Sequence, residues 1–328
     1  MSWACANPDW TEYSDGICKE ILQWAEKMPD TIVPTVFFGG GTPSLMPVDC
    51  FEKIIRTLKQ NFILPKDAEI TIEANPGTID ENKLKDFVQA GINRISIGVQ
   101  SLSDEKLKFL GRRHSANDAI KLIQSAKKLN LRTSADFIYG LPNETVNDVI
   151  LTCEQINQIG IEHCSLYELT IEPNTPFGKM NLNMPDNEIM ADMYMAIKKT
   201  LTLPRYEVSN YATPGNECQH NLNIWDGGAY IGIGRGAAGR VCIDGIWYEQ
   251  MGANQKFVAI DNETRAIEKL LMGMRTVCGC QLTDDVKKVI DIDWVKNNPE
   301  LVQIQDGRIR ATPNGLLILD DVTVNLVK

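Results

Sequence analysis

The sequence lacks any apolar run of the roughly 18 residues that a membrane-spanning helix requires. It also lacks a block of like charge, because its 43 acidic and 33 basic residues are dispersed along the chain. With a formal net charge of −10, broad electrostatic binding of nucleic acid is not expected. Residues 1–10 show no basic region followed by an apolar core, so we expect a cytoplasmic protein.

Cysteine and histidine are present but are not clustered. The nine cysteines include no closely spaced set of three, since Cys5 and Cys18 are far apart and Cys278 with Cys280 forms a lone pair. The three histidines add little to a metal site with several ligands. A chain of 328 residues with 43% apolar content does not need disulfides to build a core. From the residues alone we predict reduced thiols and no zinc or iron–sulfur site.

The chain is organised around residues 35–46, which read TVFFGGGTPSLM. An apolar run over 36–38 stops at three consecutive glycines, and a helical pattern follows over 51–58. This order predicts a strand, a bare loop and a helix. A flexible connection needs only one glycine, whereas three leave backbone N–H and C=O groups open to a ligand. We therefore interpret the loop as part of a ligand site.

The same strand-then-helix pattern recurs over the first two thirds of the chain. The expected strand centres are Phe37, Ile72, Ile97, Phe137 and Leu166. Helical patterns are expected over residues 9–28, 51–58, 84–88, 119–129 and 145–159, and Thr78 with Glu81 has the spacing of a capping box. These spacings are typical of βα units and predict an α/β fold with a parallel, barrel-like sheet. A doubly wound sheet stays open as the alternative, because the pattern does not reveal whether the sheet closes.

One face of the expected strands is small or polar. Ser96, Gly98 and Gln100 alternate with apolar residues, and Thr71 with Glu73, and Ser134 with Asp136, repeat the pattern. A barrel interior packed for stability would carry branched apolar side chains instead. The acidic or amide residues near strand ends are Glu73, Gln100, Asp136 and Glu168. Together with the glycine loop, they predict a polar ligand site inside the sheet.

The last third of the chain carries weaker signals. We expect a sixth strand within 206–211, a helical pattern from Glu249 through Leu271, and a short ribbon and helix over 309–319. The ending is compatible with a winged-helix-like arrangement, which does not by itself indicate DNA binding. Residues 234–239 fit GxGxxG, but this motif follows the parallel repeat instead of starting it, so we reject a nicotinamide site there.

Six segments, taken in order, resemble a known family. They are VFFGGGTPSLM, TIEANPGT, INRISIGVQS, ADFIYGLP, ECQHNLNIW and the ending over 312–319. The chain is similar through them to the HemW heme-chaperone branch of radical S-adenosylmethionine proteins, relatives of oxygen-independent coproporphyrinogen III oxidase. The resemblance implies an incomplete parallel (β/α) barrel over 1–215, with a small, mainly helical region over 216–328 that is winged-helix-like towards its end.

The resemblance also implies ligand contacts. The residues that match family contacts to S-adenosylmethionine are Gly40, Gly41, Thr42, Glu73, Gln100, Arg112 and Asp136. His220 matches a segment associated with heme, and Trp225 would give the macrocycle an aromatic surface, although Ile224 stands where the family has Tyr. No catalytic residue is predicted.

The front of the chain departs from the family, whose first strand carries CxxxCxxC and whose three thiolates bind a [4Fe–4S] cluster. Neither that motif nor that strand is recognisable here, so the family cluster has no metal ligands in this sequence. A missing N-terminal piece and a branch that has lost its cluster both explain this. We expect the missing piece, because losing the radical chemistry would not remove a structural strand.

Three functions follow as hypotheses. The first is a HemW-like chaperone that binds heme and delivers it to acceptor proteins, respiratory proteins among them, with peripheral membrane association through such partners. The second is a radical enzyme of porphyrin biosynthesis related to coproporphyrinogen oxidase, which requires the cluster. The third is a non-catalytic remnant that binds neither S-adenosylmethionine nor heme. No nucleic-acid partner is expected.

Overall fold

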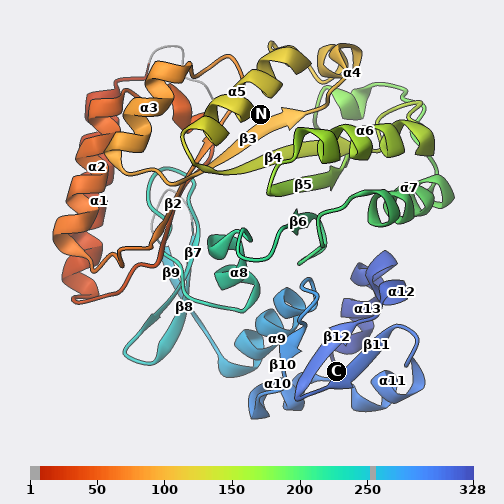
Figure 1. The fold of residues 1–328 in the computed structure, drawn as a ribbon. Coiled ribbons are helices and arrows are strands. Elements are labelled where there is room, and N and C mark those ends of the chain that lie inside the picture. The colour runs from red at the N-terminus through yellow and green to blue at the C-terminus, as the bar shows by residue number, and fades with distance from the viewer. Residues whose placement is uncertain (1–7, 252–255) are drawn as a thin grey trace.

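A computed structural model describes residues 8–251 and 256–328. Its larger part is a six-stranded sheet whose strands follow one another in chain order (Figure 1). These strands are β1 (Thr35–Phe38), β2 (Glu69–Ala74), β3 (Arg94–Gln100), β4 (Arg132–Tyr139), β5 (His163–Glu168) and β6 (Asn210–Ala212). The first five run parallel, whereas β6 is antiparallel to β5.

The sheet is an open barrel. Within the described residues, β1 pairs along the sheet only with β2, and β6 only with β5. In a doubly wound sheet the strand order would reverse near the middle, and here it does not. The incomplete barrel is therefore confirmed and the doubly wound alternative is wrong. The expected sixth strand exists but is shorter than predicted, beginning at Asn210.

Helices cover the outer face of the sheet (Figure 1). They are α1 (Trp10–Lys27), α2 (Val48–Asn61), α3 (Glu81–Ala90), α4 (Asp104–Phe109), α5 (Ala116–Lys128), α6 (Val146–Ile159) and α7 (Asn187–Thr200), with short 3-10 turns η1 (Pro43–Leu45) and η2 (Phe177–Lys179). The apolar alternation of the strands explains this layer. Ile95, Ile97 and Val99 of β3 are fully buried on the helix side, which leaves the polar alternation for the inner face.

The capping box predicted at Thr78 and Glu81 is wrong. The helix α3 is instead capped by Asp80, whose carboxylate accepts a hydrogen bond from the Lys83 N–H at 2.8 Å. The Thr78 hydroxyl donates to the carbonyl of Asn75 at 2.7 Å, so it belongs to the preceding turn. An aspartate is an equally good N-cap, and it stands directly before the helix.

The C-terminal third begins with α8 (Gln219–Trp225) and continues as a second and a third small sheet. The strands are β7 (Gly239–Ile243), β8 (Ile246–Met251), β9 (Lys256–Ile260), β10 (Cys280–Gln281), β11 (Val302–Gln305) and β12 (Arg308–Ala311). The helices are α9 (Asn262–Gly273), α10 (Asp284–Val289), α11 (Ile292–Asn297), α12 (Pro313–Leu317) and α13 (Leu319–Leu326). The ribbon and helix expected near the end are confirmed as β12 and α12.

The helical pattern predicted from Glu249 is wrong over 249–251 and 256–260, and its residues 252–255 lie outside the described ranges. The described residues of this stretch form β8 and β9, which pair in an antiparallel ribbon. The Phe257 ring packs edge-on against Trp24 of α1, with centroids 5.5 Å apart. That contact joins residues far apart in the sequence, and no local pattern could reveal it. Helix α9 begins only after Asp261, whose carboxylate accepts from the Thr264 N–H.

Two separate apolar cores divide the molecule. The larger lies under the barrel helices, and Tyr248 and Phe257 of the β7–β9 ribbon pack against it. The smaller is built within the last elements around Leu270, Val302 and Ile309. The boundary predicted between residues 215 and 216 stays a prediction. None of the helices in the described ranges is both long and apolar enough to cross a membrane.

Candidate functional site

The inner face of the sheet converges on Asp136 of β4. Three serine hydroxyls contact its carboxylate, from Ser96 at 2.8 Å, Ser134 at 3.2 Å and Ser165 at 2.7 Å. Burial raises the pKa of Asp136, and the hydroxyl donors oppose that rise. The polar strand face predicted from the sequence is therefore present. It holds a fixed acceptor to which a ligand hydroxyl or ammonium could donate.

The glycine loop follows β1 and lies against Glu73 at the end of β2. The Gly40 N–H donates to Oε2 of Glu73 at 3.2 Å, and Gly40 has a φ of 109° that side-chain-bearing residues rarely adopt. Burial raises the pKa of Glu73, the Gly40 hydrogen bond lowers it, and the charge of Asp136 raises it further. Beside Gly41 an added Cβ would meet no atom within 4 Å, so the loop borders open space.

Gln100 and Thr42 approach the same end of β2. Gln100, the last residue of β3, has a φ of 68° at a register irregularity in the β3–β4 pairing. A Cβ on Gly98 would lie 2.8 Å from Nε2 of Gln100 and 2.9 Å from Oδ1 of Asn75, so the ends of these two side chains would have to shift if Gly98 were replaced. The hydroxyl of Thr42 accepts from Nδ2 of Asn75 at 3.3 Å. These residues gather at the carboxyl ends of the strands, as predicted.

Two predicted residues are not joined to this group. Arg112 is half-buried, and desolvation lowers the pKa of its guanidinium. It forms no ion pair with any described residue, and its ligand role stays a prediction. Glu168, the other carboxylate expected at a strand end, is exposed.

His220 lies on α8, which packs across the inner side of β1. Its Nδ1 is 3.2 Å from the hydroxyl of Thr35, and its ring stacks on Phe37 with centroids 5.0 Å apart. No hydrogen bond to Nε2 occurs in the part of the chain that the structure describes. Burial lowers the pKa of His220, with Glu69 acting in the opposite direction. A neutral imidazole with Nε2 unengaged is the form that binds iron.

Glu69 anchors the helix that carries His220, and the sequence reading missed it. Its buried carboxylate accepts from the backbone N–H groups of Gln219 and His220, both at 3.1 Å. The same carboxylate pairs with Arg132 at 2.9 Å and lies 3.9 Å from Nε of Arg94. The available signal was a charged residue at the start of each of three successive buried strands, β2, β3 and β4.

The two groups therefore lie towards opposite ends of the strands. Gly40 and Glu73 mark the carboxyl ends, whereas Thr35 and Glu69 are the first residues of β1 and β2. Trp225, expected to offer an aromatic surface, has the guanidinium of Arg275 4.8 Å from its ring centroid. One face of that indole is thus already occupied.

Comparison with known proteins assigns the chain to a family. The Radical SAM superfamily model matches residues 3–156. The protein named heme chaperone HemW from Escherichia coli (strain K12) is 44% identical over 213 residues, which is 64% of this chain and 56% of that protein. Radical S-adenosyl methionine domain-containing protein 1, mitochondrial, from Danio rerio is 32% identical over 88% of this chain and 74% of its own length.

This chain belongs to the HemW family of radical S-adenosylmethionine proteins. It spans 56% to 62% of the length of the first three HemW relatives that it matches. The solved structure of coproporphyrinogen III oxidase (HemN) from Escherichia coli, a radical SAM enzyme, superposes with a TM-score of 0.78 over 96% of this chain and 82% of that chain. At 18% identity, this likeness describes the fold alone.

Membership in the HemW family implies S-adenosylmethionine and a [4Fe–4S] cluster. The inner face described above fits the first, because it offers carboxylates, an amide and open glycine backbone. The described residues do not fit the second: they contain no group of three or more His, Cys, Asp or Glu placed to hold a metal. Burial also raises the pKa of the Cys218 thiol to about 11 and that of Cys153 to about 12.

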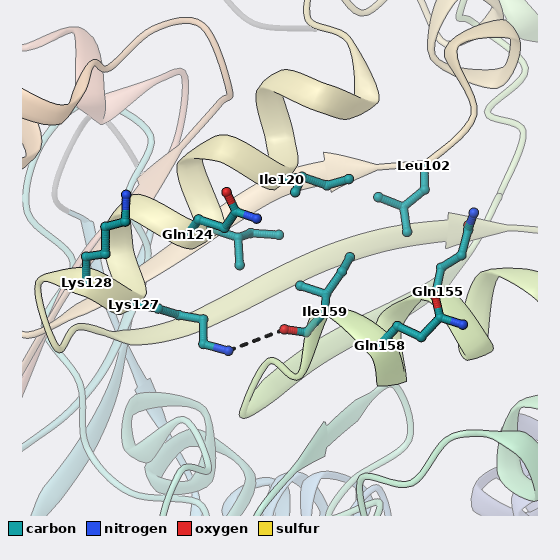
Figure 2. A pocket seen from close by; sticks show the side chains of 9 residues that line it. Leu102, Ile120, Gln124, Lys127, Lys128, Gln155, Gln158 and Ile159 are labelled. Carbon is teal, nitrogen blue, oxygen red and sulfur yellow. Dashed lines mark hydrogen bonds between the residues drawn. The ribbon is translucent and has the colours of Figure 1, made fainter.

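One groove of this HemW-family chain lies elsewhere. Its volume is about 800 Å³, and Figure 2 shows it between α5 and α6 on the helix side of the sheet. The lining residues are Leu102, Ile120, Ile123, Gln124, Lys127, Lys128, Gln155, Gln158 and Ile159. The Lys127 ammonium donates to the carbonyl of Ile159 at 3.3 Å, which ties the two helices together. None of the predicted site residues lines this groove.

Proposed function

We propose that this chain binds heme and hands it to acceptor proteins. The observation that supports the proposal most is the geometry of His220, whose Nδ1 faces Thr35 while Nε2 has no hydrogen bond to the described residues. The similarity to relatives named heme chaperone HemW supports the same function. Acceptors of respiratory type, contact with membranes through them, and a cytoplasmic location are parts of the same proposal.

The arrangement around His220 suits heme that is bound for later release to a partner. Nε2 would give its lone pair to the heme iron, while Thr35 and Phe37 keep the ring in one orientation. Only one imidazole is available here, because His163 and His114 are both buried elsewhere. A site with a single protein ligand and partial exposure holds heme less completely than an enclosed pocket would, and release to a partner becomes easier.

We further propose that the glycine loop and the polar residues on the inner face of the sheet hold S-adenosylmethionine. Glu73 and Asp136 would accept hydrogen bonds from its ammonium and ribose hydroxyls, and the backbone of Gly40, Gly41 and Thr42 would border its methionine end. This cofactor would supply radical chemistry only beside a cluster, for which the described residues offer no ligand set. The residues of this chain bind and orient it.

A porphyrinogen oxidase is the second candidate, because the fold resembles the coproporphyrinogen III oxidase structure closely. That reaction needs a cluster, which the described residues do not hold. Reconstitution with iron and sulfide, followed by an assay for S-adenosylmethionine cleavage, distinguishes the candidates. Cleavage with conversion of coproporphyrinogen would favour the oxidase.

His220→Ala is expected to weaken heme binding at least about tenfold, because the variant loses the nitrogen that ligates the iron. The measurement is a titration with hemin followed through the Soret band. Gln219→Ala is the matched control, since Gln219 is an exposed neighbour on the same helix. Equal affinity of the wild type and His220→Ala would remove His220 from the proposed site.

A further inference from the structure

A buried chain of hydrogen bonds connects the barrel interior to the start of α8. The Cys218 N–H donates to the hydroxyl oxygen of Tyr206 at 3.3 Å, and that hydroxyl lies 2.8 Å from Nε2 of His163. Nδ1 of His163 lies 2.7 Å from the Ser134 hydroxyl, which is 3.2 Å from Oδ1 of Asp136. Four residues of this hydrogen-bond chain are each at most 8% exposed, namely Cys218, Tyr206, His163 and Ser134.

The carboxylate of Asp136 sets the direction of every donor in this chain. Ser134 has one proton, and when it donates to Asp136 its oxygen must accept from Nδ1–H of His163. Nε2 of His163 then accepts from Tyr206, whose oxygen accepts from Cys218. In the reverse direction the Tyr206 proton would find no acceptor among the described residues. Only the first arrangement satisfies all four donors.

This arrangement requires a neutral His163. Burial lowers the pKa of His163 well below its usual range, and the nearby charges of Arg94 and Arg132 lower it further. The ring therefore carries one proton, on Nδ1. Hydrogen bonds aligned head to tail polarise one another, so a change at one end is transmitted to the other.

We propose that His163 is a positioning residue that couples the Asp136 carboxylate to the Cys218 amide, and so to the helix that carries His220. The carboxylate fixes the tautomer of His163, and that tautomer lets Tyr206 hold the first turn of α8. Glu69 restrains α8 separately, because its carboxylate accepts hydrogen bonds from the next two backbone amides, those of Gln219 and His220. A ligand that binds Asp136 thereby changes the restraint on His220. The consequence for heme rests on the proposed function, whereas the coupling to α8 does not.

The test compares two serines that contact the same carboxylate. Ser134→Ala removes the hydroxyl that connects His163 to Asp136 and so breaks the hydrogen-bond chain. Ser165→Ala removes another hydroxyl from Asp136 and leaves the hydrogen-bond chain intact. The measurement is amide hydrogen exchange of residues 218–225 in the ligand-free protein. Ser134→Ala is expected to speed exchange about fivefold, the effect of one net hydrogen bond, and Ser165→Ala less than twofold.

A second pair probes the other end of the chain. Tyr206→Phe should speed exchange to a similar degree, whereas Tyr211→Phe, a buried tyrosine of β6 outside the chain, should not. Combining Ser134→Ala with Tyr206→Phe should add little to either change, because both interrupt one chain. A molten variant would show faster exchange throughout the barrel. The other variant, compared with its own control, would then decide whether the coupling exists.

Equal exchange in Ser134→Ala and Ser165→Ala, or independent effects of Ser134→Ala and Tyr206→Phe, would overturn the coupling. Heme titration supplies the functional readout: Ser134→Ala should shift the Soret signature of imidazole ligation and weaken binding about fivefold, unlike Ser165→Ala. If the wild type binds no heme, the proposed function fails, while the exchange comparison still decides the coupling.

Discussion

Glu69→Gln is expected to lower the free energy of unfolding by at least about 3 kcal/mol, because it leaves buried guanidinium charge without its partner. Glu69 is 2% exposed, and its carboxylate pairs with Arg132 and lies near Arg94. Arg94 is almost as buried, at 3% of its side chain, whereas Arg132 keeps 30% exposed and is partly screened. The expected value therefore lies at the low end of the range for breaking buried ion pairs.

Urea unfolding followed by circular dichroism measures this change. Glu81→Gln is the matched control, since Glu81 pairs with Lys85 on the exposed side of α3, and its midpoint should not move. Exchange of the Gln219 and His220 amides should also quicken in Glu69→Gln, because both donate to the lost charge. A Glu69→Gln protein as stable as the wild type would mean that the two arginines find other partners.

Gly40→Ala is expected to weaken binding of S-adenosylmethionine at least about tenfold. At a φ of 109°, a side chain adds about 1–3 kcal/mol of backbone strain, so the loop relaxes and must be strained again when the ligand binds. The relaxed loop also loses the Gly40 N–H donor to Glu73. There is space for the methyl group itself, because no atom lies within 4 Å of the added Cβ.

Gly41→Ala separates this backbone effect from the effect of bulk. Gly41 is adjacent, has no positive φ, and likewise has open space around an added Cβ. Its affinity for S-adenosylmethionine in equilibrium dialysis should fall less than that of Gly40→Ala, because the substitution adds a methyl group beside the ligand without backbone strain. If both variants lost affinity equally, close contact of the ligand with the glycine backbone, and not strain, would explain the loss.

The repetitive part of the fold could be predicted from the sequence. The predicted strand centres Ile72, Ile97 and Phe137 all lie inside β2, β3 and β4, since alternation of period two reports that one face of each strand is buried against helices. The β7–β9 ribbon could not be predicted in the same way. Its apolar residues look helical locally, and they form strands because Phe257 packs against the distant Trp24.

The carboxyl-end site was also largely predictable, because strand-end polar residues of a parallel sheet must meet at one edge. Glu73, Asp136 and the glycine loop came together as expected. The charged residues that begin β2, β3 and β4 marked Glu69 as unusual, but its contacts with α8 beneath His220 were not predictable. The support of this helix depends on Glu69 and Tyr206, which reach α8 from strand β2 and from the segment before β6, and no spacing rule links such positions.

The proposed function requires that heme is a cargo that the protein releases to an acceptor, and not a permanently bound cofactor. The protein is loaded with one equivalent of hemin, freed of excess, and mixed with increasing concentrations of apomyoglobin as acceptor. The Soret band then reports which protein holds the heme. A chaperone should give up its heme within minutes and completely to a tenfold excess of acceptor, and His220→Ala should give it up faster. Heme that stays bound over hours, or a wild type that takes up none, would contradict heme delivery.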